Sequence, residues 1–134
     1  NLGNTPLSFS PNVIVGNMLI YQPKDNFQIS FLSKYVGEQF MSNLNSNVSK
    51  LDVLDSYFTS DLNFTYEIAT KKVFDAIIIS GLINNIFNTE YVDRGYYYTY
   101  DDTWSNPEAI TTFDGAGYYP QATANFLVGI SLKF

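Results

Sequence analysis

Residues 125–134 read NFLVGISLKF, and this stretch decides the fold class of the chain. Every second residue from Phe126 to Phe134 is apolar. The residues between them are small or polar, except Leu127. The apolar set, begun by Ala124, is Phe126, Val128, Ile130, Leu132 and Phe134. A period of two is the signature of a β-strand with one apolar face. The stretch therefore predicts a strand, which we place at about 122–134.

The same period dominates the rest of the chain, and a helical period is hard to find. We expect an all-β fold with four more strands, at about 12–22, 27–40, 54–68 and 74–84. The strand at 54–68 is the cleanest. It sets Phe58, Leu62, Phe64, Tyr66 and Ile68 against Thr59, Asp61, Asn63, Thr65 and Glu67. Residues 41–53 and 85–121 are predicted to be long loops, the second being the longest irregular stretch.

Composition excludes several classes of protein. The chain has 134 residues, of which 17% are aromatic and 15% charged, and its net charge is −6. The sequence has no cluster of Lys or Arg that could bind the phosphates of a nucleic acid, so a nucleic-acid partner is excluded. It contains no cysteine and no histidine, which removes disulfides, His-based metal sites and His-dependent catalytic triads. No metal ion or cofactor is expected.

Membrane helices and a leader are not expected either. No segment approaches the ~18 consecutive apolar residues of a transmembrane helix. The opening stretch NLGNTPLSFSP has neither the basic start nor the apolar core of a signal peptide. A transmembrane β-strand, however, needs only ~9–11 alternating residues. The sequence thus leaves a membrane β-barrel open.

Loop lengths point toward such a barrel. Short turns follow the first and third predicted strands, and long connections follow the second and fourth. This alternation places short turns at one end of the sheet and long loops at the other, as in bacterial outer-membrane barrels. Five strands alone would leave open edges in hydrocarbon. We therefore expect either several copies closing a barrel together or one part of a larger barrel.

Five stretches, taken in order, carry a family resemblance. They are SPNVIVGNMLIYQP at 10–23, LSKYVGEQFMSN at 32–43, LDSYFTSDLNFTY at 54–66, GLINNIFNTEYVDRGYYYTY at 81–100 and YYPQATANFLVGISLKF at 118–134. Together they resemble the C-terminal end of a TonB-dependent outer-membrane receptor of the type found in Bacteroidetes. Ile86 stands where the family's Asn-Asn-Leu-Phe-Asn element usually has Leu.

The resemblance implies an antiparallel up-and-down transmembrane β-barrel in the bacterial outer membrane. The family's barrel has 22 strands and is plugged by an N-terminal domain; this chain would supply about the last five strands. Its partners would be the rest of the barrel, the plug, outer-membrane lipid, the barrel assembly machinery, and TonB acting through a more N-terminal region. It would import a scarce ligand and would not be an enzyme. The Tyr-Pro-Gln element favours an iron–siderophore or cobalamin-like ligand, with a glycan as the other option. The terminal Phe134 resembles the family's assembly signal.

The candidate ligand-binding residues lie in the second long loop. Rings beside carboxylates suit sugar stacking or capture of an aromatic chelate, because they combine apolar faces with hydrogen-bonding tips. The candidates are Arg94, Tyr96, Tyr97, Tyr98, Tyr100, Asp101, Asp102 and Trp104. Alternatively, these rings pack the base of the loop or form part of an aromatic girdle.

Other polar groups have plainer interpretations. Asp101, Asp102, Asp114 and Glu108 have calcium-binding oxygens, but their spacing fits no EF-hand, so solvated loop charge is favoured. The asparagines at 84, 85 and 88 are expected to bond to local backbone and to accept left-handed conformations. Lys34 and the polar set of the 54–68 strand form either a solvated wall or a surface for the plug. The alternative to a receptor is a soluble β-sandwich module that binds carbohydrate.

Overall fold

The structure, a computed structural model, describes residues 5–43, 50–70, 73, 75–105 and 109–134, and these form an all-β fold with antiparallel sheets. The expected fold class is confirmed at this level. The strands are β1 Ile14–Lys24, β2 Phe27–Val36, β3 Gln39–Phe40, β4 Val53–Leu54, β5 Tyr57–Ala69, β6 Ala76–Asn84, β7 Val92–Asp102, β8 Thr111–Pro120 and β9 Asn125–Lys133. One 3-10 turn, η1, spans Lys50–Asp52. No helix in these ranges is long and apolar enough to cross a membrane.

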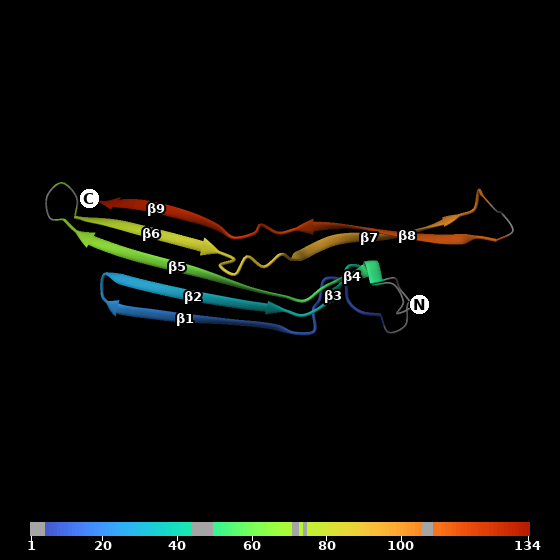
Figure 1. Cartoon of the computed structure of the whole chain (residues 1–134), viewed down its shortest axis with the longest axis horizontal. Helices are drawn as coiled ribbons and strands as arrows, with labels where there is room; N and C mark the ends of the chain where they lie inside the picture. The colour runs from blue at the N-terminus through green and yellow to red at the C-terminus, as the bar shows by residue number, and fades with distance from the viewer. Residues whose placement is uncertain (1–4, 44–49, 71–72, 74, 106–108) are drawn as a thin grey trace. The chain divides into compact units, whose positions relative to one another are not determined.

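Five strands form one sheet in the order β1-β2-β5-β6-β9 (Figure 1). These correspond to the five predicted strands, with ends shifted by a few residues. The predicted strand at 27–40 is wrong in its last part, because β2 ends at Val36 and Gln39 and Phe40 pair with β4 instead. Just after β2 the Gly37 N–H donates to the Val13 carbonyl, and a Cβ on Gly37 would lie 3.2 Å from that oxygen. This close backbone approach coincides with the end of the strand.

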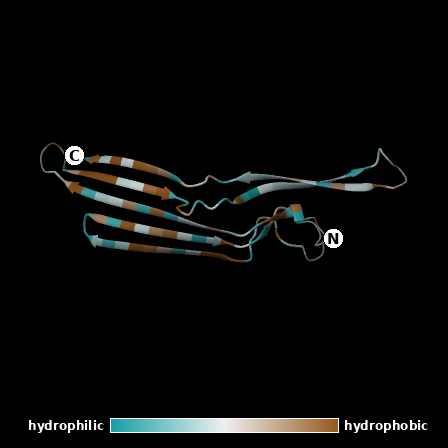
Figure 2. Ribbon diagram, in the orientation of Figure 1, coloured by the Kyte–Doolittle hydropathy of each residue, from teal (hydrophilic) through white to brown (hydrophobic). Residues whose placement is uncertain are grey.

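The register of β5, β6 and β9 aligns apolar residues in rows across the sheet. The rows on one face are Leu62–Ile83–Phe126, Phe64–Gly81–Val128, Tyr66–Ile79–Ile130 and Ile68–Ile77–Leu132. On the same face β2 continues the pattern, since the Phe27 and Tyr66 rings meet edge to face at 6.0 Å. Figure 2 shows the alternation of hydrophobic and hydrophilic residues along these strands. The predicted amphipathic face is therefore continuous over neighbouring strands.

The opposite face of the same strands is more polar. Its rows include Thr65–Ser80–Gly129 and Glu67–Ile78–Ser131. The Asn84 amide donates to the Asn125 side-chain oxygen at 2.9 Å, and Ser80 Oγ donates to the Gly129 carbonyl at 3.4 Å. The expected polar wall thus exists, although Ile78 interrupts it.

The second expected loop is the main error of the sequence analysis. Residues 85–121 were predicted to be irregular, but they contain β7 and β8, which pair over almost their whole length. Residues 41–53 also contain η1 and the start of β4, while 44–49 lie outside the described residues. Contacts within the chain separate it into two compact units, one holding the five-stranded sheet and one holding β3, β4, η1, β7 and β8.

Candidate ligand-binding hairpin

The β7–β8 hairpin divides the predicted site residues between two faces. Antiparallel pairing opposes Arg94 to Tyr119, Tyr96 to Gly117 and Tyr98 to Gly115. Because side chains alternate along a strand, one face of β7 carries Arg94, Tyr96, Tyr98, Tyr100 and Asp102. Tyr97 and Asp101 lie on the opposite face. Trp104 follows the strand and is 93% exposed. The structure therefore brings together only part of the predicted cluster.

Two glycines let the tyrosine rings lie across the hairpin. A Cβ on Gly115 would lie 2.6 Å from the Tyr98 hydroxyl oxygen, and a Cβ on Gly117 would overlap the Tyr96 ring. Glycine in a strand usually weakens it, because it has no side chain to pack. Here the ring of the opposite residue covers each glycine, as in cross-strand aromatic–glycine pairs of stable sheets. Gly115 and Gly117 therefore shape this surface.

The rings continue along the hairpin as one row. Tyr96 lies 6.3 Å from Tyr98 and 6.2 Å from Tyr119, centroid to centroid, and Tyr100 stacks on Phe113 at 5.5 Å. We call this set the aromatic row: Tyr96, Tyr98, Tyr100, Phe113 and Tyr119. Its tyrosines on β7 are 51–55% exposed. The row thus keeps about half of its ring surface open to solvent.

The other face of the hairpin packs against its own unit. Tyr118 donates a hydrogen bond to the Leu51 carbonyl at 2.9 Å, and a Cβ on Gly95 would come within 2.6 Å of the Met41 sulfur. Tyr97 donates to Asp114 at 3.3 Å. Burial, and then the Asp114 carboxylate, raise the pKa of the Tyr97 hydroxyl. Tyr97 therefore lies on the face opposite the aromatic row and is half-buried there.

Asp102 has a structural role at the end of β7. Its Oδ1 accepts the Trp104 N–H at 2.9 Å and the Ser105 N–H at 3.0 Å. Hydrogen bonds from Ser105, side chain first, and from the Trp104 backbone lower the pKa of the Asp102 carboxyl. This is the side-chain-to-backbone bonding that aspartate provides in turns. Oδ1 of Asp102 thus already accepts hydrogen bonds from the turn that follows β7.

The remaining carboxylates of the hairpin also have local partners. Asp101 accepts a hydrogen bond from Thr112 at 2.6 Å, and Asp114 accepts one from Tyr97. Glu108, the fourth residue considered for calcium, lies outside the described residues. Among the residues that are described, no three His, Cys, Asp or Glu side chains gather closely enough to hold a metal ion.

A polar network closes the base of the hairpin. Gln39 donates to the Asp93 carbonyl at 3.2 Å, and Gln121 donates to the Asp93 carboxylate at 2.6 Å. Arg94 contacts the same carboxylate at 3.3 Å, and a β-bulge lies between Val92 and Arg94. The Tyr57 and Tyr91 rings stack nearby at 4.3 Å. The carboxylate of Asp93 thus offsets much of the charge of Arg94.

Asn84, Asn85 and Asn88 were predicted to bond to local backbone and to accept left-handed conformations; Asn84 instead lies within β6 and bonds to the Asn125 side chain, and the other two follow the strand. Asn85 and Asn88 have positive φ angles of 51° and 53°. Asn85 is 4% exposed; its amide donates to the Thr89 carbonyl at 2.7 Å and accepts the Thr89 N–H at 2.9 Å. Asn88 accepts the Ala124 N–H at 3.0 Å. Asp61, predicted as part of the polar wall, accepts the Asn85 N–H at 2.8 Å.

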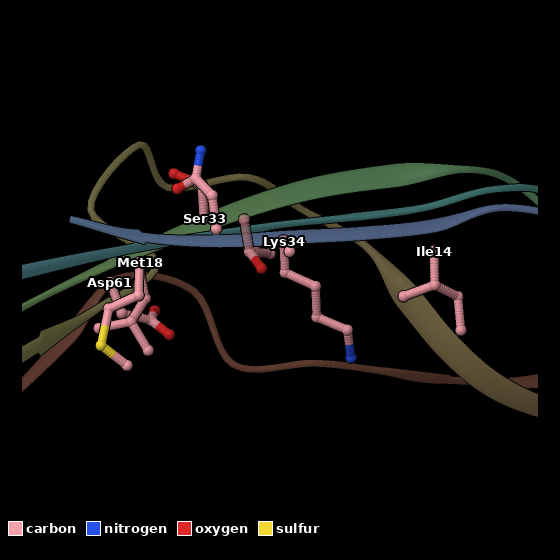
Figure 3. Close-up of a pocket in the computed structure, with 9 residues that line it drawn as sticks. Ile14, Met18, Ser33, Lys34 and Asp61 are labelled. Atoms are coloured by element: carbon pink, nitrogen blue, oxygen red, sulfur yellow. The ribbon is translucent and has the colours of Figure 1, made fainter.

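One hollow of about 510 Å³ lies on the five-stranded sheet. The side chains of Met18, Lys34 and Asp61 lie on the same side of the strands there (Figure 3). Leu32 and Thr59 also line it. Its lining is mainly apolar, with one cationic and one anionic group, and the geometry singles out no reaction.

Comparison of the chain with models of protein families, with curated proteins and with solved structures finds no match.

Sequence reasoning missed the half of the aromatic row that comes from β8. Phe113, Gly115, Gly117 and Tyr119 are spaced two apart within TTFDGAGYYP, residues 111–120. That spacing was a readable signal for a strand face shared by rings and glycines. Glycine and aspartate are also typical of loops, and the segment was therefore predicted to be part of the loop at 85–121.

Proposed function

We propose that this chain forms the C-terminal strands of the β-barrel of a TonB-dependent receptor in the bacterial outer membrane. The strand order β1-β2-β5-β6-β9 follows the order of the strands along the chain, with β7–β8 inserted before the last one. An up-and-down barrel has this connectivity. The inserted hairpin corresponds to a long extracellular loop, and the turn between β1 and β2 to a short periplasmic one.

The observation that carries the proposal is the open apolar face of the five-stranded sheet. Phe126 is 78% exposed and Ile130 is 68% exposed, although both lie in rows of apolar residues. Burying such a side chain stabilises a protein by about 1.5–3 kcal/mol. A single sheet exposed to water would lose this stabilisation for each apolar side chain on the face. Lipid covering this face accounts for the exposure.

The edges of the sheet support a larger barrel. The order ends at β1 on one side and β9 on the other. In hydrocarbon each unsatisfied backbone group costs several kcal/mol, so membrane sheets close on themselves. Further strands of the same receptor would pair with β1 and β9, and the plug would face the polar side. Phe134 would serve the barrel assembly machinery as a terminal aromatic signal.

In this proposal the receptor imports a scarce ligand with energy from TonB and catalyses no reaction. The ligand classes are an iron–siderophore, a cobalamin-like compound or a glycan. The second candidate is the soluble β-sandwich that binds carbohydrate, because the aromatic row is compatible with it as well as with a receptor. The two candidates differ in what covers the face bearing Phe126 and Ile130, lipid or a second sheet.

Cysteine scanning along β9 tests the proposal, because the chain has no native cysteine. Single cysteines at 126 to 132 in the full-length receptor, expressed in the outer membrane, would carry an environment-sensitive fluorophore. We expect quenching by lipid-attached quenchers at positions 126, 128, 130 and 132. Positions 127, 129 and 131 serve as the matched controls and should respond to a water-soluble quencher. A protein that is monodisperse without detergent, and in which no position responds to the lipid-attached quenchers, would favour the β-sandwich and refute the receptor.

A further inference from the structure

The aromatic row has three properties that together indicate its ligand: an open flat surface, an extended shape and an uncharged middle. We propose that the row binds a neutral, extended oligosaccharide by stacking of sugar rings on its tyrosines. The inference deepens the receptor proposal by naming the ligand class, and it rests on that proposal for the place of the hairpin outside the membrane.

The surface is held open before any ligand arrives. The glycines opposite Tyr96 and Tyr98 leave room for the two rings to lie across the hairpin rather than to stand away from it. Tyrosine has few rotatable bonds, so little conformational freedom is lost when it is contacted. Rings that already lie in place reduce the entropic cost of binding. The exposed faces are therefore suited to stacking.

The row is too long for a single compact group. Tyr96 and Tyr100 are four residues apart on one strand, which corresponds to roughly 13 Å between their Cα atoms. Tyr119, opposite Arg94, extends the row at one end, and Phe113 adds a ring beside Tyr100. A chain of linked sugar rings can contact all of these at once. A single chelate would contact only one or two rings.

Charge separates a saccharide from the anionic ligands that would also stack. Residues 92–120 contain four aspartates, one glutamate and one arginine, a formal net charge of −4. The arginine is Arg94, which lies at one end of the row and contacts Asp93. An anionic catecholate chelate or a single-stranded nucleic acid would be repelled. A neutral sugar is not.

The chemistry of the rings agrees with a hydroxylated ligand. Four of the five rings are tyrosines, whose hydroxyl groups offer hydrogen bonds at the margin of an apolar face. Sugar rings present the same combination, with apolar C–H faces and a rim of hydroxyls. The Tyr-Pro-Gln element predicts an iron–siderophore or cobalamin-like ligand, whereas the hairpin favours the glycan option.

Binding measurements on the full-length receptor in detergent test this inference. The probes are the neutral hexasaccharides cellohexaose, xylohexaose, mannohexaose and maltohexaose, with a ferric tris-catecholate as the anionic competitor. We expect at least one hexasaccharide to bind with a Kd that does not depend on salt, because no charge is neutralised. Tyr98→Ala should weaken that binding about tenfold, the size of effect found when one stacking ring is removed.

Two further variants distinguish stacking from general damage. Gly115→Val keeps every ring but displaces that of Tyr98, and should weaken binding about as much as Tyr98→Ala, by roughly tenfold. Tyr97→Ala is the matched control, because it removes a ring from the opposite face, and should leave the Kd nearly unchanged. Circular dichroism of each variant should match the parent.

Any of three results overturns the inference: no neutral hexasaccharide binds, only the ferric catecholate binds, or Tyr97→Ala weakens binding as much as Tyr98→Ala. The cysteine scan of β9 reports separately on the receptor. Saccharide binding by a protein whose β9 shows no quenching by lipid would refute the receptor and keep the aromatic row. A lipid-facing β9 without saccharide binding would support the receptor and refute saccharide binding by the aromatic row.

Discussion

The five-stranded sheet and the β7–β8 hairpin share one construction and differ in the chemistry of their rings. In both, an aromatic ring covers a glycine on the neighbouring strand: Phe64 over Gly81 in the sheet, Tyr98 over Gly115 in the hairpin. The rows around Phe64 are aliphatic or phenylalanine with one tyrosine, whereas those around Tyr98 are mostly tyrosine. A hydroxyl is costly in hydrocarbon and favourable in water. The same pairing of a ring with a glycine thus occurs with phenylalanine in the sheet and with tyrosine in the hairpin.

The two regions also differ in how they end. Asn85 closes the end of β6 with a buried side chain that bonds to backbone, and Asp102 closes β7 with a carboxylate outside any core. Both side chains replace backbone hydrogen bonds that the strand no longer provides. Because the Asn85 side chain is buried, losing its hydrogen bonds would destabilise the sheet: an unsatisfied buried polar group costs free energy. The second affects only its own turn.

The largest expected effect is a charge placed on the apolar face of β9. In the proposed barrel, Ile130→Lys should lower the free energy of unfolding in lipid vesicles by about 2–4 kcal/mol, the cost of a cation near the middle of a lipid-facing wall. Ser131→Lys puts the same group on the polar face and should change it little. Urea unfolding followed by circular dichroism measures both. Equal losses for the two variants would mean that lipid does not cover the Ile130 side.

Next in size is the loss of the buried cap. Asn85→Ala removes hydrogen bonds to Thr89 and Ala122 and places an alanine at a φ of 51°. We expect about 2–3 kcal/mol of destabilisation in the same urea experiment. Asn85→Gly loses the bonds but tolerates the backbone, so it should cost about 1 kcal/mol less. If glycine costs as much as alanine, backbone conformation plays no part.

A matched pair of glycine substitutions probes the shared device. Gly81→Val forces the Phe64 ring out of a sheet row and should destabilise the sheet by about 1–3 kcal/mol. Gly115→Val forces out the Tyr98 ring, which is already half exposed, and should cost less than about 1 kcal/mol. The urea midpoints of the two variants measure the difference. A larger loss for Gly115→Val would contradict the view that the hairpin ring is free to move into solvent.

The smallest effect is local and depends on pH. Hydrogen bonds from Ser105 and Trp104 lower the pKa of Asp102 in the folded state, so the turn is stabilised above the ordinary aspartate pKa. This stabilisation is lost as pH falls through the lowered value. Trp104 is the only tryptophan, and its emission should report the change.

Two variants of the same position give the control for that titration. Asp102→Asn keeps an oxygen that can accept the N–H groups, and should abolish the acid transition while keeping the neutral-pH emission. Asp102→Ala removes the acceptor and should give the acid-form emission at every pH. A transition that survives in Asp102→Asn would have to come from another group.

Much of the fold was predictable because a period of two is a local property. The alternation in NFLVGISLKF and in the 54–68 stretch marked both faces of β9 and β5 before any pairing was known. The left-handed backbone at Asn85 and Asn88 was also predicted, because that preference belongs to the residue itself. Asn84, predicted together with them, lies within β6 instead.

The hairpin was missed because its stability is not local. Gly115 and Gly117 lower the strand tendency of β8 when it is considered alone. The rings that compensate for them come from Tyr98 and Tyr96, about twenty residues earlier in the chain. For the same reason the candidate cluster was drawn too broadly. Sequence proximity grouped Tyr97 and Asp101 with the open rings, although pairing places both on the opposite face, and Asp102, which shares the face of the rings, bonds to the turn after β7.

The sequence by itself therefore determined the fold class, the apolar and polar faces of the main strands and the absence of cysteine and histidine chemistry. These depend on residue type and spacing, which are visible in one dimension. Only the tertiary structure decided that Leu62, Ile83 and Phe126 share a row, and that Tyr96 and Tyr98 lie on glycines of β8. Such rows depend on register between distant segments, and a shift of one residue would have turned each side chain to the other face.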